Sequence, residues 1–459
     1  MLDKKIKAGL SEIVGQASLK QDETVNDYAV DGLLPQAVLF PRTVEEVERI
    51  AIVAFEEGLS IIPWGGGTQM ELGAPPMRAD LVVCLNRLDR ILDQDHENMS
   101  ITAEAGIRLG AIQESLCHVG SGFFLPLDPP RAEEVTLGGA VAANGSGPSQ
   151  LRYGTLRDLV LGLEVAIPEE REKSQKTRAG GKTVKNVSGY DMSKLYIGSI
   201  GTLAIIVEVT CRIIPLPEER ATVVAGFPQP EAAWACTQGL LETQLIPSSI
   251  EVYNREVASL FPAHTRLSVK GEAWVAVRIE GIREAVARQI VEINSLTDSE
   301  GATEISILRG PEEGDYWKQV GRLGLEVRNR GAWGIGLKAS VPISHAPDIS
   351  KAMGEEGEKI DVSCNQLTHA GSGIVYIHIP LPEGLYNEKQ EALTRMVMAF
   401  REMAKEMGGS LVVEYAPPVF KERIDVWGEV GGVVPIMEAL KKEFDPRAVL
   451  NPGRYVGGI

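Results

Sequence analysis

Three glycine-rich segments, each beside an expected β-strand, constrain the N-terminal half of this chain more than any other feature. They read IIPWGGGTQ at 61–69, TLGGAVAANGSG at 136–147 and GSIGTLA at 198–204. Glycine loses more conformational freedom on folding than any other residue, so such runs indicate positive φ angles or close approach of another group to the main chain. Consecutive backbone N–H groups in loops of this kind bind anions. Tight turns in a glycine-rich α/β protein are the alternative interpretation.

The two most familiar phosphate-binding motifs do not occur at these loops. GGGTQ is not followed by the GK[ST] of a P-loop, and a GxGxxG with an acidic residue about twenty positions later is absent. The 459 residues carry a formal net charge of −17, which argues against nucleic acid or an anionic membrane surface as a partner. Main-chain amides are therefore the expected means by which this acidic chain would neutralise a phosphate.

Hydrophobic periodicity predicts two domains with different patterns of secondary structure. Strands are expected at 37–41, 81–85, 159–167 and 202–217. A helix is expected at 43–58, where Thr43 and Glu46 have capping-box spacing. The Gly- and Pro-rich stretch 126–158 is expected to be an ordered loop with short apolar islands. Beyond Pro217, strands and helices alternate in an α+β pattern with an antiparallel sheet.

The cysteines and the N-terminus predict a cytoplasmic protein without direct membrane insertion. The five cysteines lie at positions 84, 117, 211, 236 and 364, with no CxxC spacing, so neither a full disulfide framework nor an iron–sulfur cluster is expected in this chain. The first residues, MLDKKIKAGLSEIV, lack the apolar core of a signal peptide. No apolar stretch is long enough for a membrane-spanning helix.

Five ordered blocks carry a family resemblance. They are PWGGGTQ (63–69), PLDPP (126–130), TLGGAVAANGSGPSQLRYGTLRDLVLGLEV (136–165), GGKTVKNVSGYDMSKLYIGSIGTLAIIVEVT (180–210) and FDPRAVLNPGRY (444–455). With these blocks, residues 30–217 resemble the FAD-binding domain of the vanillyl-alcohol-oxidase/PCMH family, and in particular the glycolate oxidase FAD-binding subunit and the D-2-hydroxyacid dehydrogenases.

The resemblance implies an α+β fold in four parts. These are an N-terminal helical lead (1–30), a two-subdomain PCMH-type FAD-binding domain (31–217), an α+β cap domain with an antiparallel sheet (218–420) and a C-terminal segment that packs back on the FAD domain (421–459). The residues that it implies for FAD binding are Trp64, Gly65, Gly66, Gly67, Thr68, Gln69, Asp128, Thr136, Gly138, Gly139, Asn144, Gly145, Arg152, Tyr153, Gly154, Asn186, Gly189, Tyr190, Gly201, Thr202, Ile206 and Asn451.

The resemblance also bears on how the flavin is attached. Relatives with a covalent flavin use a His or a Cys, but 61–73 contains neither and 126–210 contains no His. FAD is therefore expected to be bound noncovalently.

The residues expected to meet the substrate differ from the motifs of the family. Relatives that oxidise 2-hydroxy acids carry a GHxGDGNxH stretch and a GEHGIG stretch, whose His and Glu residues bind a divalent metal or the substrate. Here His369 and Glu414 match, but Tyr376 and Tyr415 stand where the family has His. His378 shares a strand face with Tyr376, yet lies about 6–7 Å further along. The expected catalytic residues are therefore His369, Glu414 and His378, and no bound metal is expected.

A substrate carboxylate also needs a cation. The candidates near the strand-like stretch 337–344 are Arg322, Arg328, Arg330 and Lys338, each with an ordinary surface charge as the alternative.

The function that the resemblance implies is FAD-dependent oxidation of a small 2-hydroxy acid. The chain is expected to be an FAD-binding subunit that passes electrons to an iron–sulfur partner, with a second flavin subunit as a further possible partner, and to reach the inner membrane only through such partners. A stand-alone D-lactate dehydrogenase and a non-catalytic FAD relay or structural subunit are the alternatives.

Overall fold

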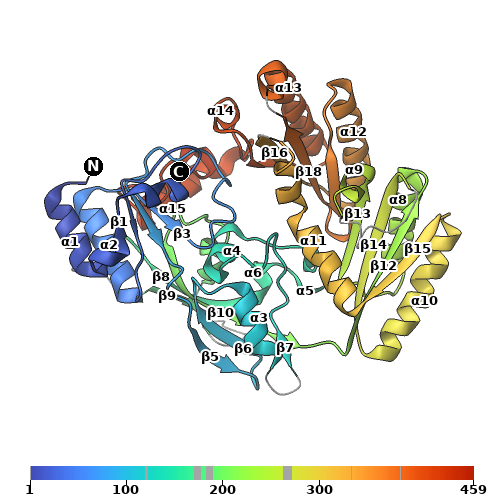
Figure 1. Ribbon diagram of the computed structural model, residues 1–459, viewed down its shortest axis with the longest axis horizontal. Helices are drawn as coiled ribbons and strands as arrows, with labels where there is room; N and C mark the ends of the chain where they lie inside the picture. The colour runs from blue at the N-terminus through green and yellow to red at the C-terminus, as the bar shows by residue number, and fades with distance from the viewer. Residues whose placement is uncertain are drawn as a thin grey trace. The chain divides into compact units, whose positions relative to one another are not determined.

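The computed structural model describes residues 2–118, 122–169, 177–181, 190–261, 271–331, 333–382 and 384–459. The chain divides into two compact units, which Figure 1 shows coloured along the sequence. The first unit consists of Met1–Ser146, Thr155–Leu216 and Glu429–Ile459, and the second of Gly147–Gly154 and Pro217–Gly428. Both ends of the chain therefore belong to the first unit.

The first unit contains a small four-stranded sheet, and its edge strand β3 (Ile61–Trp64) leads into the first glycine loop. The strand order is β1 (Leu19–Lys20), β2 (Ala37–Leu39), β4 (Leu81–Cys84) and β3. The strands β2, β4 and β3 are parallel, and the helices α1 (Lys4–Val14) and α2 (Val44–Glu57) pack with them around one apolar core. Thr43 caps α2 by accepting a hydrogen bond from the Glu46 N–H at 3.2 Å, as the sequence spacing predicts.

The second sheet of this unit is antiparallel. Its order is β5 (Ile91–Asp95), β6 (Ser100–Glu104), β10 (Ile205–Arg212), β8 (Val160–Ala166) and β9 (Thr177–Gly180). Helix α3 (Leu109–Cys117) packs against this sheet's apolar core. A separate pair joins β7 (Phe123–Phe124) to β11 (Ile214–Pro215). The strands expected at 37–41, 81–85 and 159–167 are thus present, whereas the one expected at 202–217 is divided into β10 and β11.

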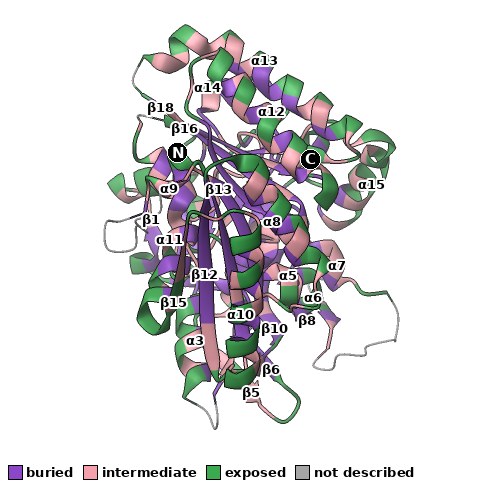
Figure 2. Cartoon of the chain, turned by 90° about the vertical axis from the view of Figure 1, so that its right-hand side faces the viewer, coloured by how far each residue is buried: buried purple, intermediate pink, exposed green. Residues whose placement is uncertain are grey.

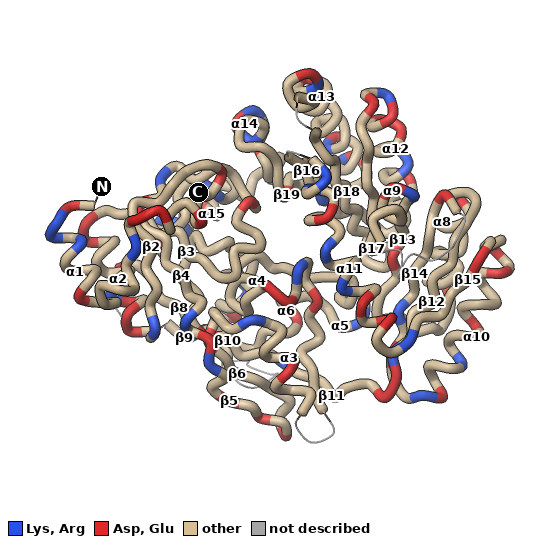
Figure 3. Tube along the Cα trace, viewed as in Figure 1, with Lys and Arg blue, Asp and Glu red and all other residues tan. Residues whose placement is uncertain are grey.

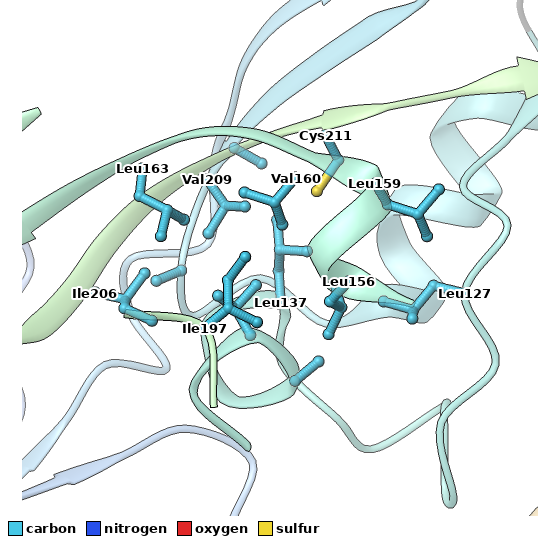
Figure 4. Close-up of a cluster of buried hydrophobic side chains, with 14 of the residues drawn as sticks. Leu127, Leu137, Leu156, Leu159, Val160, Leu163, Ile197, Ile206, Val209 and Cys211 are labelled. Carbon is cyan, nitrogen blue, oxygen red and sulfur yellow. The ribbon is translucent and has the colours of Figure 1, made fainter. Parts of the chain in front are cut away.

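The stretch 126–158 is expected from the sequence to be an ordered loop, but three short helices begin within it. They are α4 (Leu137–Ala143), α5 (Gln150–Tyr153) and α6 (Leu156–Leu159). The Thr136 side chain caps α4, and Thr155 and Asp158 form a capping box on α6. The apolar islands of this stretch, including Leu137, Leu156 and Leu159, are buried in the core that Figure 4 shows. Local caps and burial therefore make helices that their length alone would not stabilise.

The second unit is built on an eight-stranded antiparallel sheet, which confirms the expected α+β class. Its order is β15 (Glu304–Arg309), β12 (Glu219–Phe227), β14 (Ala273–Gly281), β13 (Ser249–Asn254), β17 (Asn365–His369), β18 (Ile374–Leu381), β16 (Trp333–Ser340) and β19 (Ser410–Tyr415). Figure 2 shows β12 and β13 as buried and the outer side of α10 (Arg283–Ser299) as exposed.

Helices cover both faces of this sheet. The helices α8 (Pro230–Glu242) and α10 bury one face of β12, β13 and β14, and α12 (Ala346–Lys359) and α13 (Leu385–Glu406) pack on β18 and β19. Helix α11 (Gly310–Arg328) covers part of the opposite face with an aromatic core. Figure 3 shows charges of both signs along α10 and α12. Glu251, His369, Tyr376 and Lys338 lie on the face that carries α11.

Candidate functional site

The first two glycine loops pack directly against each other in the first unit. A Cβ atom added to Gly65 would meet Oγ1 of Thr136 at under 3.0 Å, and one added to Gly66 would meet the carbonyl oxygen of Glu134 equally closely. Real Cβ atoms essentially never approach another heavy atom so closely. Both positions are therefore crowded by the protein's own atoms, the Thr136 side chain at Gly65 and the Glu134 main chain at Gly66, and not only by a ligand.

The third glycine loop and the C-terminal segment both contact β3, the strand before the first glycine loop. A Cβ atom on Gly201 would lie 3.2 Å from Cγ of Pro63 and 3.3 Å from Nδ2 of Asn451. The Asn451 side chain donates a hydrogen bond to the carbonyl of Ile200 at 2.6 Å, and its backbone N–H donates to Ile61 at 2.9 Å. Segments that are far apart in the sequence therefore converge at the end of β3.

A buried lysine holds the C-terminal segment in place. Lys441, in α15 (Val434–Phe444), donates to the carbonyls of Thr202 and Leu450 at 2.7 and 2.8 Å, and to the carboxylate of Asp445 at 2.7 Å. Asp445 in turn accepts hydrogen bonds from the backbone N–H groups of Val449 and Leu450. Burial lowers the pKa of Lys441, while Asp445 opposes that shift. This network connects the third glycine loop to the turn that carries Asn451.

Several buried polar atoms beside these loops have no protein partner. Within the described ranges, Oδ1 of Asn144, Oγ of Ser146 and Oδ1 of Asn451 are buried without a hydrogen-bond partner. Asn144 ends α4 in the left-handed conformation and lies against Gly198 of the third loop. An unmatched buried polar atom costs about 1–3 kcal/mol, so such atoms are normally paired. The three atoms thus fit a bound molecule that is rich in hydrogen-bonding groups.

The second unit carries a buried carboxylate–imidazole pair. Glu251 on β13 lies directly opposite His369 on β17, so both side chains point to the same face of the sheet. Nδ1 of His369 lies 2.8 and 2.7 Å from the two carboxylate oxygens of Glu251. Glu251 is fully buried and His369 is 6% exposed. With Nδ1–H donated to Glu251, Nε2 of the neutral ring is free to accept a proton.

A row of rings continues from His369 across the neighbouring strands. Tyr376 lies between His369 and His378, with ring centroids 5.0 and 6.2 Å away. His378 in turn stacks at 5.9 Å on Tyr415, whose hydroxyl lies 3.0 Å from Nδ1 of His378. Burial lowers the pKa of His378 to about 4, so its ring is neutral at ordinary pH. His378 is therefore a packed ring, separated from His369 by Tyr376.

Lys338 places a positive charge beside these rings. It lies opposite Tyr376 in the pairing of β16 with β18, and its Nζ is 5.7 Å from the centre of the Tyr376 ring. The Tyr376 hydroxyl and, to a smaller extent, Glu414 raise the pKa of Lys338 against the opposing effect of burial. Burial also raises the pKa of Tyr376 to about 12. An ammonium and a neutral phenol therefore lie together next to His369.

A β-bulge puts Tyr415 on the same face as Glu414, which follows Val412, the partner of Lys338, by two residues. Gly336 pairs with Tyr415 whereas Leu337 pairs with Val413, so Glu414 is an extra residue in β19. Burial raises the pKa of Glu414, and both Lys338 and His369 act against that rise. The Tyr415 ring lies over Gly336, where an added Cβ would meet it at under 3.0 Å. Lys338 and Glu414 are only half-buried.

Comparison with known proteins decides the family. Residues 35–172 match the family described as "FAD binding domain", and residues 216–455, more than half of the chain, match "FAD linked oxidases, C-terminal domain". The chain belongs to the FAD-linked oxidases. This FAD-linked oxidase is accordingly an oxidoreductase with FAD as its cofactor, and the unmatched polar atoms at the glycine loops fit that group.

Individual relatives cover almost the whole chain. The FAD-linked oxidase is 28% identical over 475 residues to the glycolate oxidase subunit GlcD of Bacillus subtilis (strain 168), covering 99% of this chain and 97% of that one. It is 28% identical to a D-lactate dehydrogenase of Archaeoglobus fulgidus, covering 91% of each chain.

Solved structures confirm the expected PCMH-type fold. The 4-ethylphenol oxidase from Gulosibacter chungangensis superimposes with a TM-score of 0.76 at 16% identity, covering 99% of this chain and 97% of that one. p-Cresol methylhydroxylase gives a TM-score of 0.76 at 16% identity, covering 98% and 96%.

The predicted FAD-binding residues of this FAD-linked oxidase fall into three groups. One group lies where the glycine loops and the C-terminal turn converge in the first unit. In this group Gly67 lies against Trp64, Gly138 against Ala105 and Gly145 against Gln69. Its other members are Gly65, Gly66, Thr136, Gly139, Asn144, Gly201 and Asn451. Thr202 donates to the carbonyl of Ser199 at 2.7 Å. The side chain of Ile206 is in the apolar core, as Figure 4 shows.

The second group belongs to the other unit, and the third is the stretch around Tyr190. Arg152 and Tyr153 donate hydrogen bonds to the backbone carbonyl and the carboxylate of Glu280 at 2.7 and 2.6 Å, and Gly154 follows them in the same unit. Tyr190 is 94% exposed. Asn186 and Gly189 lie outside the described residues. FAD-binding roles for all of these residues stay predictions.

The sequence missed Glu251, the partner of His369. The only local signal is an acidic residue within the otherwise apolar alternation of SIEVYN. Of the four cations that the sequence suggests, Lys338 lies against the Tyr376 ring, while Arg322 and Arg328 are on α11 and Arg330 is exposed. In the part of the chain that the structure describes, no three His, Cys, Asp or Glu side chains are grouped as a metal site, and no helix is long and apolar enough to cross a membrane.

Proposed function

We propose that this FAD-linked oxidase oxidises the CH–OH group of a small 2-hydroxy acid, with His369 as the base. The observation that carries the proposal is the buried pair of Glu251 and His369, whose geometry holds a proton on Nδ1 and leaves Nε2 to take the proton of the substrate hydroxyl. The relatives named as a glycolate oxidase subunit and a D-lactate dehydrogenase support this substrate class.

The chemistry balances with FAD as the oxidant. When bound, FAD supplies a two-electron acceptor for the hydrogen on the carbinol carbon, which leaves with its electron pair. His369 takes the hydroxyl proton, and the C–O bond becomes the carbonyl of a 2-oxo acid. Glu251 stabilises the imidazolium that forms, so the positive charge is not left unpaired in a buried place. We propose that FAD is held noncovalently.

Anaerobic flavin reduction tests this function. The purified chain is mixed with glycolate or D-lactate, and bleaching of the oxidised flavin is followed. We expect His369→Ala to slow bleaching by about 10²-fold or more, because general-base catalysis typically contributes that much. The matched control is His345→Ala, since the His345 side chain is 44% exposed. Equal bleaching by wild type and His369→Ala would remove His369 from this role.

We also propose that the electrons leave through a cluster-bearing partner chain. The five cysteines are all unpaired, and four of them are buried at separate places, so this chain has no evident thiolate set for a cluster of its own. GlcD is named as a subunit, which supports a multi-chain assembly, and a stand-alone D-lactate dehydrogenase is the alternative. Co-purification from native cells distinguishes the two. A chain whose flavin ignores hydroxy acids but that co-purifies with an iron–sulfur protein would instead be an electron relay.

A further inference from the structure

The polar cluster beside His369 does not fit a divalent metal. Tyr376 occupies a position where the related motif has a His, and a phenol that stays protonated is a poor ligand at neutral pH. The ammonium of Lys338 lies against that same ring. A second cation placed there would be repelled by it. The residues present therefore disagree with the metal that the motif resemblance implies.

The same cluster contains a positive charge and a hydrogen-bond donor that can bind an anionic substrate. The Lys338 ammonium and the Tyr376 hydroxyl both come from positions paired directly across β16 and β18, and the Tyr376 ring contacts His369 at 5.0 Å. Lys338 and Glu414 are half-buried, whereas His369 and Tyr376 are buried. A charge-assisted hydrogen bond at such a place is strong, because water screens it little.

We propose that Lys338, with the hydroxyl of Tyr376, binds the carboxylate of the substrate. In this chain the Lys338 ammonium thus provides the positive charge that a divalent cation would otherwise provide. The inference rests on the proposed function, because it assigns the substrate group that Lys338 meets. Glu414 is the counter-charge that Lys338 faces before a carboxylate arrives. Binding of an anion at Lys338 therefore competes with Glu414.

Propionate is the probe, since it has a carboxylate but no hydroxyl to oxidise. Its affinity for the full-length FAD-loaded protein is measured by calorimetry in wild type, Lys338→Met, Lys338→Arg and Lys351→Met. Lys351→Met is the control because that lysine is 66% exposed on α12. We expect Lys338→Met to weaken binding by about 10- to 100-fold, as for loss of a charged hydrogen bond. Lys338→Arg should retain part of the affinity and Lys351→Met all of it.

Two further measurements keep the proposal testable if Lys338→Met does not fold. Glu414→Gln keeps Lys338 and removes the competing charge, so it should tighten propionate binding several-fold. Wild-type protein treated with EDTA should contain no stoichiometric metal and keep its affinity for propionate. Unchanged binding in Lys338→Met, weaker binding in Glu414→Gln, or loss of binding on chelation that zinc or manganese restores would each overturn the proposal.

These outcomes are separable from failure of the proposed function. If no 2-hydroxy acid bleaches the flavin but propionate binds and depends on Lys338, the anion site stands and the oxidation does not. If glycolate or D-lactate bleaches the flavin equally well in wild type and Lys338→Met, the oxidation stands and the role of Lys338 is wrong.

Discussion

Nδ1 of His369 lies 2.7 Å from a carboxylate oxygen of Glu251, although 118 residues separate the two in the sequence. Both residues are on adjacent antiparallel strands in direct register, and both are buried. A buried carboxylate in this position determines which ring nitrogen carries the proton. The tautomer of His369 therefore depends on a residue 118 positions away in the sequence.

Replacing Glu251 should impair turnover more than binding. In Glu251→Gln the amide can also donate to Nδ1, so the ring no longer has one preferred tautomer, and we expect flavin reduction by a 2-hydroxy acid to slow by about 10²-fold. Affinity for propionate should stay within about threefold, because the amide keeps the shape and the hydrogen bond. Stopped-flow reduction and calorimetry measure the two effects.

The control for this prediction is Glu256→Gln, since Glu256 is exposed just after β13. If Glu251→Gln and Glu256→Gln reduce flavin at the same rate, Glu251 does not position His369.

Adding one methyl group at Gly66 should separate the first two glycine loops. The Cβ of alanine would collide with the carbonyl oxygen of Glu134, which is main chain and cannot rotate away. We expect Gly66→Ala to destabilise the protein by about 1–3 kcal/mol, as for other overpacked sites, and to lower the fraction of protein purified with FAD. Denaturant unfolding and the flavin-to-protein absorbance ratio measure these effects.

Gly9→Ala provides the matched comparison. Gly9 is inside α1 with no heavy atom within 4 Å of an added Cβ, so alanine should stabilise the helix by about 0.5–1 kcal/mol. Full FAD content and unchanged stability in Gly66→Ala would contradict the close packing of these loops.

Loss of the Lys441 ammonium should release the C-terminal segment. Lys441→Met removes three hydrogen bonds and leaves the buried Asp445 carboxylate without its countercharge. Breaking a buried pair by removing one partner typically costs about 3–5 kcal/mol. We expect a loss of that size in the free energy of unfolding, together with faster proteolytic cleavage of residues after 429 and weaker retention of FAD.

The neighbouring Lys442 is exposed and tests whether a nearby charge alone matters. Lys442→Met should change the free energy of unfolding by no more than about 0.5 kcal/mol. If the two variants are equally stable, the buried network does not hold this segment.

The buried ring of His378 should make stability depend on pH in a defined window. Its pKa is about 4 in the folded protein and 6.5 as an ordinary histidine, because burial disfavours the charged ring. As the pH falls below about 6.5, the unfolded chain takes up a proton that the folded protein does not, so the folded protein loses stability. The loss is complete near the folded pKa of about 4 and amounts to at most about 3 kcal/mol.

His378→Asn has no titrating ring and can still accept a hydrogen bond from Tyr415. The difference in unfolding free energy between wild type and this variant should be constant above about pH 7. It should then shift in favour of the variant by up to about 3 kcal/mol as the pH is lowered toward 4. Urea unfolding across this range measures it, and a difference that does not vary with pH would show that His378 is charged or solvated in the folded protein.

Much of the local architecture follows from the sequence alone. The helix at 44–57 begins where Thr43 and Glu46 predict, and the strands at 37–39 and 81–84 lie within their apolar runs, because these features depend on caps and on residues a few positions apart. The ordered motif blocks identify an FAD-binding fold for the same reason, since each block is a local pattern. The helices that begin within 126–158 could not be predicted in this way, because each is only four to seven residues long and shows no clear helical periodicity.

Tertiary structure alone decides the chemistry of the second unit. Glu251 becomes the partner of His369 only through the register of β13 and β17, and Tyr415 joins Glu414 on that face only because a bulge adds one residue to β19. Lys338 is on β16 opposite Tyr376, whereas Arg322 and Arg328 are on helix α11. Side chains along a strand alternate between the two faces, so pairing register and bulges determine which of them meet, and these depend on the whole sheet rather than on any segment of the sequence.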